Sequence, residues 1–94
     1  MNVTIRTFQS GCGDCIFLIL KDESTQETYH IMIDCGDFTA EIKDFIKSCL
    51  GLKIDMLIVS HYDNDHVCGL IEMLNDIEMR NLRIETVSYT HLTL

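Results

Sequence analysis

Four side chains that could bind a metal ion fall within six residues of the sequence. They are His61, Asp63, Asp65 and His66, and they directly follow the apolar stretch Ile54–Ser60. Imidazole and carboxylate groups together suit Zn²⁺, Mn²⁺ or Fe²⁺. Open α/β sheets tend to place their sites at the carboxyl ends of strands, so this position favours a metal site. The alternative is a polar loop in which Asp65 caps the next helix.

Hydrophobic patterns predict three strands near the start of the chain. Apolar and polar residues alternate over Val3–Thr7, which is typical of a half-buried strand. The continuously apolar stretch Cys15–Leu20 predicts a strand that is buried on both faces. A polar hairpin loop at Lys21–Glu27 leads into a third strand at Tyr29–Ile33. We expect His30, within that third strand, to be a structural residue.

Apolar residues at helical spacing predict two helices, one on each side of the strand at Ile54–Ser60. The first helix carries an apolar stripe of Ile42, Phe45, Ile46, Cys49 and Leu50. Thr39 is suited to be its N-cap, and Gly51 lies where a C-terminal glycine belongs. The second helix carries its apolar face at Leu70, Ile71, Leu74 and Ile77. A last strand then begins near Leu82.

The predicted order β-β-β-α-β-α-β indicates an α/β (α+β) fold with a mixed sheet and helices packed on it. The 94 residues are enough for one domain, over residues 1–94. Fifteen acidic against seven basic residues give a formal net charge of −8, and such a surface repels nucleic acid unless a metal supplies positive charge.

The sequence also favours one cellular compartment for the protein. The first residues lack the pattern of a signal peptide, and the longest apolar run, Ile16–Leu20, is too short to span a membrane. The five cysteines show no disulfide-framework spacing, so we expect reduced thiols and a cytoplasmic protein. Cys35, Cys49 and Cys68 are interpreted as small packing residues.

Two segments that follow apolar strands resemble motifs of the metallo-β-lactamase superfamily. That superfamily carries His-x-His-x-Asp-His after a buried strand, and here the sequence is His61-Tyr62-Asp63-Asn64-Asp65-His66, followed by Gly69. The upstream Asp34-Cys35-Gly36 is similar to its Asp-x-Gly turn. The chain departs from the motif at Asp63, where the superfamily has its second histidine. Oxygen in place of nitrogen makes the site harder, so Mn²⁺ becomes a stronger rival to Zn²⁺.

The resemblance implies the N-terminal half of an αββα sandwich and a hydrolase that uses a metal-bound hydroxide on two ions. It implies that His61 and Asp63 hold the first metal and that Asp65 and His66 hold the second. Asp65 would also orient the nucleophile, as the catalytic residue. Supporting structural roles would fall to Asp34, Gly36, Gly69 and Asp14.

A narrower resemblance comes from Gly11-Cys12-Gly13-Asp14, which looks like the Gly-x-Gly-Asp element of the hydrolase domain of ComEC-type competence proteins. It implies a phosphodiester or another small ester as substrate, with nucleic acid contacted through the metal. Other hypotheses are a lactam or thioester hydrolase and a non-catalytic structural or regulatory module with a vestigial metal site. A redox or zinc-ribbon role for Cys12-x-x-Cys15 is a further alternative, although a thioredoxin-like site would have to open a helix.

The resemblance also implies ligands that the sequence does not supply. A complete site of this superfamily draws on another histidine, a bridging aspartate and a final histidine. The one later histidine, His91, lies in the octet at residues 87–94, which looks like translated sequencing adaptor and is therefore not taken as a ligand. We accordingly expect an N-terminal fragment that lacks substantial hydrolase activity alone and exposes a sheet face that the complete fold would bury.

Overall fold

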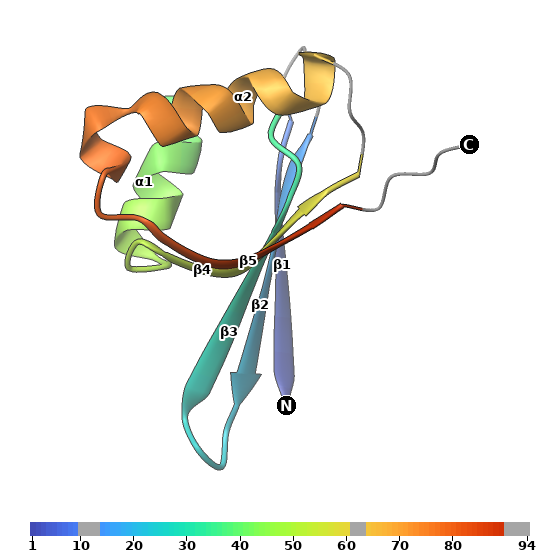
Figure 1. The fold of residues 1–94 in the computed structure, drawn as a ribbon. Helices are drawn as coiled ribbons and strands as arrows, with labels where there is room; N and C mark the ends of the chain where they lie inside the picture. Colours follow the sequence, from blue (N-terminus) through green and yellow to red (C-terminus); the bar gives the residue numbers. More distant parts are fainter. Residues whose placement is uncertain (10–13, 61–63, 90–94) are drawn as a thin grey trace.

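The protein forms one mixed sheet of five strands with two helices (Figure 1). The computed structural model describes residues 1–9, 14–60 and 64–89, and for residues 64–67 and 89 it describes the backbone alone. The strands are β1 (Asn2–Phe8), β2 (Cys15–Asp22), β3 (Glu27–Ile33), β4 (Lys53–Val59) and β5 (Arg83–Tyr89). The helices are α1 (Ala40–Ser48), α2 (Asn64–Asn75) and the short 3₁₀ helix η1 (Ile77–Met79). The predicted order and mixed sheet are confirmed.

The sheet follows the order of the chain, β1-β2-β3-β4-β5. The first three strands form an antiparallel meander, whereas β3, β4 and β5 run parallel. Each parallel pair is joined through a helix, and such crossovers are almost always right-handed. Two right-handed crossovers that progress in the same direction place α1 and α2 on the same face of the sheet, as Figure 1 shows.

Helix α1 begins as its sequence predicts, and part of its predicted stripe packs in the core. The Thr39 hydroxyl oxygen accepts a hydrogen bond from the backbone N–H of Ile42 at 3.3 Å, which satisfies a donor of the first turn. Gly51 adopts the left-handed conformation, with a φ of 62°, soon after the helix ends. Two members of the predicted stripe, Ile42 and Ile46, are fully buried, but Cys49 is exposed and does not pack in the core.

The core lies between the helices and one face of the sheet. Three aromatic rings meet there in edge-on or tilted contacts, with centroid distances of 4.9–5.9 Å between Phe8, Phe17 and Phe45. Around them lie the buried side chains Cys15, Met32, Cys35, Ile42, Ile46, Leu50, Ile54, Leu57, Val59, Leu70, Met73 and Met79.

The predicted apolar face of α2 is wrong in three of its four residues. Leu70 is buried, but Ile71, Leu74 and Ile77 are 55%, 61% and 73% exposed, and Met73 lies in the core instead. The physical reason is the close contact of Gly69 with the turn after β3, which fixes the rotation of the helix. Residues four apart share a helix face, so Met73 points to the core with Gly69.

The expectation that β2 is buried on both faces is also wrong. Phe17 is completely buried, whereas Ile16 and Leu18, its neighbours on the other face, are only partly buried. Val3 and Ile5 in β1 are 57% and 64% exposed. Both helices cover one face, so the second face of the sheet has no layer over it in the described chain.

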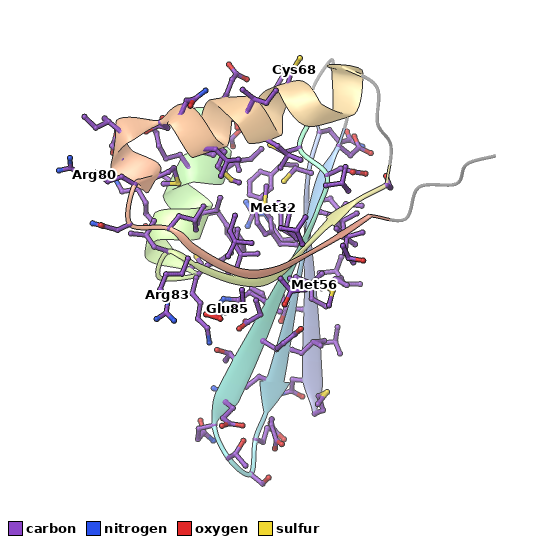
Figure 2. All side chains as sticks on the ribbon, viewed as in Figure 1. Met32, Met56, Cys68, Arg80, Arg83 and Glu85 are labelled. Atoms are coloured by element: carbon purple, nitrogen blue, oxygen red, sulfur yellow. The ribbon has the colours of Figure 1, made fainter. Side chains whose placement is uncertain are left out.

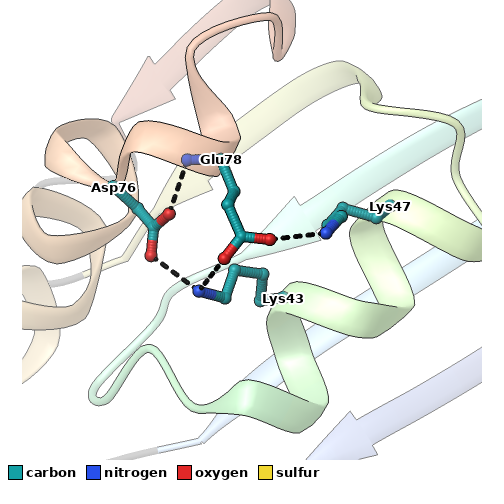
Figure 3. A network of polar contacts seen from close by, with 4 residues as sticks. All are labelled: Lys43, Lys47, Asp76 and Glu78. Carbon is teal, nitrogen blue, oxygen red and sulfur yellow. Dashed lines mark hydrogen bonds and ion pairs between the residues drawn. The ribbon is translucent and has the colours of Figure 1, made fainter.

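An ion-pair network fastens α1 to the segment between α2 and β5 (Figure 3). Lys43 donates to Asp76 and to Glu78 at 3.0 Å each, and Lys47 donates to Glu78 at 2.6 Å. These contacts hold the pKa of Glu78 at about 2, chiefly through the hydrogen bond from Lys47 and then that from Lys43. Ion pairs so exposed contribute little individually, but this network links two segments more than 30 residues apart.

Candidate metal centre

The candidate site begins where β3 and β4 end side by side. The parallel register pairs Ile33 with Ile58, and the backbone N–H of Asp34 donates to the carbonyl oxygen of Ile58 at 2.9 Å. The residues that follow both strands therefore leave the sheet at the same edge. Strands β3 and β4 are therefore neighbours in the sheet.

Asp34 fixes the residue that immediately precedes the candidate ligand segment. The backbone N–H of Ser60 donates to Asp34 Oδ1 at 2.8 Å, and the Ser60 hydroxyl donates to Asp34 Oδ2. Asp34 has a φ of 59°, a left-handed conformation that aspartate tolerates better than most residues. One carboxylate thus holds the end of β4 at two points, next to His61.

The turn after Asp34 is packed tightly against α2. Cys35 is fully buried, and its thiol donates to the carbonyl oxygen of Asp37 at 3.4 Å. A Cβ atom at Gly69 would lie 2.4 Å from the Cys35 carbonyl oxygen and 2.8 Å from its sulfur. Gly69 therefore lets the backbone of α2 approach the turn at Asp34–Asp37, and Gly36 is buried in that turn.

Strand β2, which pairs with β3 in a hairpin, begins at the same edge of the sheet. Because Ile16 pairs with Ile33 in an antiparallel register, Asp14 lies at the edge where Asp34 and Ser60 leave the sheet. The Asp14 side chain is exposed. The loops before β2, after β3 and after β4 consequently start or end together at this edge (Figure 1).

The proposed ligands can be placed only in part. His61 and Asp63 lie outside the described residues. Helix α2 begins at Asn64, so the backbones of Asp65 and His66 belong to its first turn, and their side chains are not described. Among the side chains that the structure does describe, no group of three or more His, Cys, Asp or Glu residues is arranged to hold a metal ion. The ligand roles of all four residues remain predictions.

Sequence analysis assigned no role to Ser60, which the structure places at this edge. Its signal was a polar residue at the end of an apolar strand, directly before His61. Its partner Asp34 is 26 residues away in the sequence, and only the strand pairing shows that the two meet.

Of the Cys12-x-x-Cys15 motif, the structure describes Cys15. Cys15 lies at the start of a strand and opens no helix, while Cys12 is outside the described residues. The hydrogen bond with Cys35, followed by burial, raises the pKa of the Cys15 thiol far above its usual value. Cys15 and Cys35 are therefore packing residues, whereas Cys68 is exposed, contrary to its interpretation as one.

His30 is structural, as its position in a strand predicts. It is buried, its Nδ1–H donates to the carbonyl oxygen of Lys53 at 2.7 Å, and its backbone N–H donates to Asp55 Oδ2 at 2.7 Å. A cavity of about 580 Å³, lined in part by Tyr29 and Lys53, lies at this other end of the sheet, away from the Asp34–Ser60 edge.

Two comparisons bear on this arrangement. The sequence model of the metallo-beta-lactamase superfamily matches residues 16–91, which extend from β2 through β5 and include both helices. No curated protein matches the chain. No helix in the described part of the chain is long and apolar enough to cross a membrane.

Proposed function

Because the chain belongs to the metallo-β-lactamase superfamily, whose members are generally hydrolases, we propose that it carries a metal-dependent hydrolase site at the Asp34–Ser60 edge. The ligands in this proposal are His61, Asp63, Asp65 and His66. The observation that carries it is the pair of hydrogen bonds from Ser60 to Asp34, which anchors the chain at the residue before the first ligand. Metal-binding residues depend on such anchoring groups for their orientation.

The donor set suits Zn²⁺ or Mn²⁺. Two imidazoles and two carboxylates are available within six residues, and the carboxylate at Asp63 shifts the preference toward a harder ion. Divalent ions bound there would lower the pKa of water and stabilise negative charge that develops on the substrate. In the proposal Asp65, in the first turn of α2, orients the attacking water.

The proposed substrate class is a phosphodiester. The motif Gly11-Cys12-Gly13-Asp14, which resembles that of ComEC-type hydrolase domains, supports this choice over a lactam or thioester. With a net charge of −8, the protein itself repels a phosphate group, so the metal would supply the positive charge that binds it. Nucleic acid would be contacted through the metal in the same way.

Metal binding by the 94-residue chain is the first test. We expect Mn²⁺ to bind the wild-type chain, with binding measured by electron paramagnetic resonance. His66→Ala should weaken the Mn²⁺ affinity at least about tenfold, because one ligand is lost. Asp34→Asn, which keeps the side-chain shape, should weaken it about ten- to a hundredfold through the lost anchor of Ser60. His91→Ala is the matched control and should leave the affinity unchanged. Wild-type affinity in the His66→Ala variant would contradict the proposed ligand set.

Substrate class is tested on the Mn²⁺-loaded chain with non-reacting probes. Dimethyl phosphate should change the resonance spectrum, whereas a β-lactam and a thioester at equal concentration should not. We expect only slow hydrolysis of a generic phosphodiester, because the chain offers four candidate ligands and a two-metal centre draws on more. A response to the lactam or thioester alone would overturn the substrate class. Metal binding without a response to any probe would favour a non-catalytic module with a vestigial site.

A further inference from the structure

Strand β1 forms one edge of the described sheet. It pairs only with β2, in an antiparallel ladder that runs from Asn2 to Phe8 without a bulge. The chain has no proline, so every residue of β1 keeps a backbone N–H group that can donate. An uninterrupted edge strand of this kind offers its outward backbone groups to another extended segment.

The strand registers show which backbone groups of β1 point outward. Residues along an antiparallel strand bond alternately to one neighbouring strand and to the other. In β3, the backbone N–H of His30 points to β4, where it donates to Asp55 Oδ2 at 2.7 Å. Alternation from His30 across β2 then turns the N–H and C=O groups of Val3, Ile5 and Thr7 outward. Among the described residues, no backbone group outside the β1–β2 ladder bonds to these three residues.

A groove of about 290 Å³ lies beside this edge, between β1 and helix α1. Its lining comes from the end of β1 and from one side of α1, and consists of Arg6, Phe8, Glu41, Asp44, Phe45, Ser48 and Cys49. Arg6 lies on the helix-facing side of the sheet, because it pairs with Phe17, which pairs in turn with Met32. Figure 2 shows Met32 between the sheet and the helices. A strand added beside β1 therefore places alternate side chains at this groove.

The groove carries two carboxylates that the described chain leaves without an ion pair. Glu41 and Asp44 are exposed on α1, and neither forms a salt bridge with a described residue. Arg6 is held over two rings instead, with its Cζ 4.8 Å from the centroid of Phe8 and 5.6 Å from that of Phe45. The groove thus favours a cationic side chain. A second copy of the chain, with its own net charge of −8, is disfavoured as the occupant.

We propose that β1 binds an extended basic segment of a partner protein, which adds to the sheet as a further strand. The main chain of that segment bonds to the outward groups of Val3, Ile5 and Thr7, and these hydrogen bonds supply affinity. A lysine or arginine side chain of the segment enters the groove beside Glu41 and Asp44, and this contact supplies specificity. The inference does not rest on the proposed hydrolase function.

The location of this contact distinguishes it from two other surfaces of the sheet. Strand β5, at the other end of the strand order, carries charged Arg83 and Glu85, which pair with each other at 3.0 Å (Figure 2). Charged side chains on an edge strand disfavour the addition of another strand. The proposed contact uses the edge of β1 and its helix-facing side, so it is compatible with burial of the opposite sheet face in the complete superfamily fold.

The test titrates the ¹⁵N-labelled chain with an acetylated, amidated five-residue peptide that has a central lysine between two valines and threonine at both ends. We expect the amide resonances of Val3, Ile5 and Thr7 to shift, because their N–H groups gain acceptors. A peptide methylated on both valine nitrogens should bind at least about tenfold more weakly, because the N–H groups that donate to β1 are lost. A peptide with glutamate in place of lysine should show no binding at the same concentrations.

Substitutions in the groove test the basic specificity. Glu41→Gln and Asp44→Asn should each weaken binding of the lysine peptide about two- to fivefold, as expected for exposed ion pairs. Glu72→Gln is the matched control, because it removes the same charge from an exposed position on α2 and should leave the affinity unchanged. The dispersion of each variant's own amide spectrum checks that it is folded.

Four results would each overturn the proposal. The first is no shift of the β1 amides at millimolar lysine peptide, and the second is equal affinity for the methylated and unmethylated peptides. The third is an equal loss of affinity in Glu72→Gln and Glu41→Gln, which would show that only the net charge matters. The fourth is a shift of the β1 amides with protein concentration in the absence of peptide, which would make a second copy of the chain the occupant.

Discussion

Gly69→Ala should destabilise the protein by about 2 kcal/mol, although alanine is the better helix former. The added Cβ would lie 2.4 Å from the Cys35 carbonyl oxygen, 2.8 Å from Cys35 Sγ and 2.9 Å from the Asp37 backbone nitrogen. Two of these three atoms belong to the backbone, so they cannot move aside as a flexible side chain would. Overpacking of this kind lowers the free energy of unfolding by about 3 kcal/mol at the upper end of its usual range. The helical preference for alanine over glycine raises it by about 1 kcal/mol, which leaves the net loss.

The measurement is urea-induced unfolding, with thermal unfolding beside it. A loss of about 2 kcal/mol corresponds to a fall in Tm of roughly 8–16 °C for a domain of this size. Glu72→Ala, an exposed position on the same helix, is the matched control and should be neutral or slightly stabilising. Metal affinity, measured at a temperature where the variant is folded, should fall as well, because α2 and the Asp34–Asp37 turn are pushed apart. A Gly69→Ala variant as stable as the wild type would refute the argument that this contact fixes the rotation of α2.

Two further predictions concern charges and thiols. The pKa of Glu78 is lowered from 4.5 to about 2, so the contribution of its carboxylate to stability is present above pH 4.5 and is lost as the pH falls toward 2. Glu78→Gln and Lys47→Met should each reduce the acid dependence of unfolding between these two pH values. If both variants retain the wild-type acid profile, the network contributes nothing to it. A thiol-reactive dye should label Cys49 and Cys68 rapidly in the native protein, because both are exposed. It should not label Cys15 or Cys35, because these residues are at most 1% exposed and the hydrogen bond between them raises the pKa of the Cys15 thiol. Cys15→Ser should therefore leave the amplitude of rapid labelling unchanged, and a smaller amplitude would show that the pair is accessible.

Local sequence signals were sufficient for the order of the elements and for the edge at which the candidate site begins. Thr39 capped the helix that it was expected to cap, because a capping side chain bonds to residues within its own turn. The end of an apolar strand before His61 indicated the edge of the sheet at which the candidate site would begin, because strand ends are marked by a change from apolar to polar residues.

The rotation of α2 could not be predicted in the same way. Apolar residues occupy more than one side of this helix, so periodicity alone does not choose between a face with Leu70 and Met73 and a face with Ile71 and Leu74. The contact between Gly69 and Cys35, which are 34 residues apart in the sequence, determines which face of α2 packs on the core. Likewise, an apolar run such as Cys15–Leu20 shows that a strand could be covered on both faces but not that it is.

The order of the strands has a consequence for how the protein folds as it is synthesised. Each strand of the described sheet pairs only with the strands that precede and follow it in the chain. The antiparallel meander β1–β3 closes short loops and can form first, whereas β4 and β5 must each await a helical crossover, which is a slower, less local step. Among these five strands, none has to be inserted between two that are already paired. The described part of the sheet can therefore grow from β3 one strand at a time as the chain leaves the ribosome.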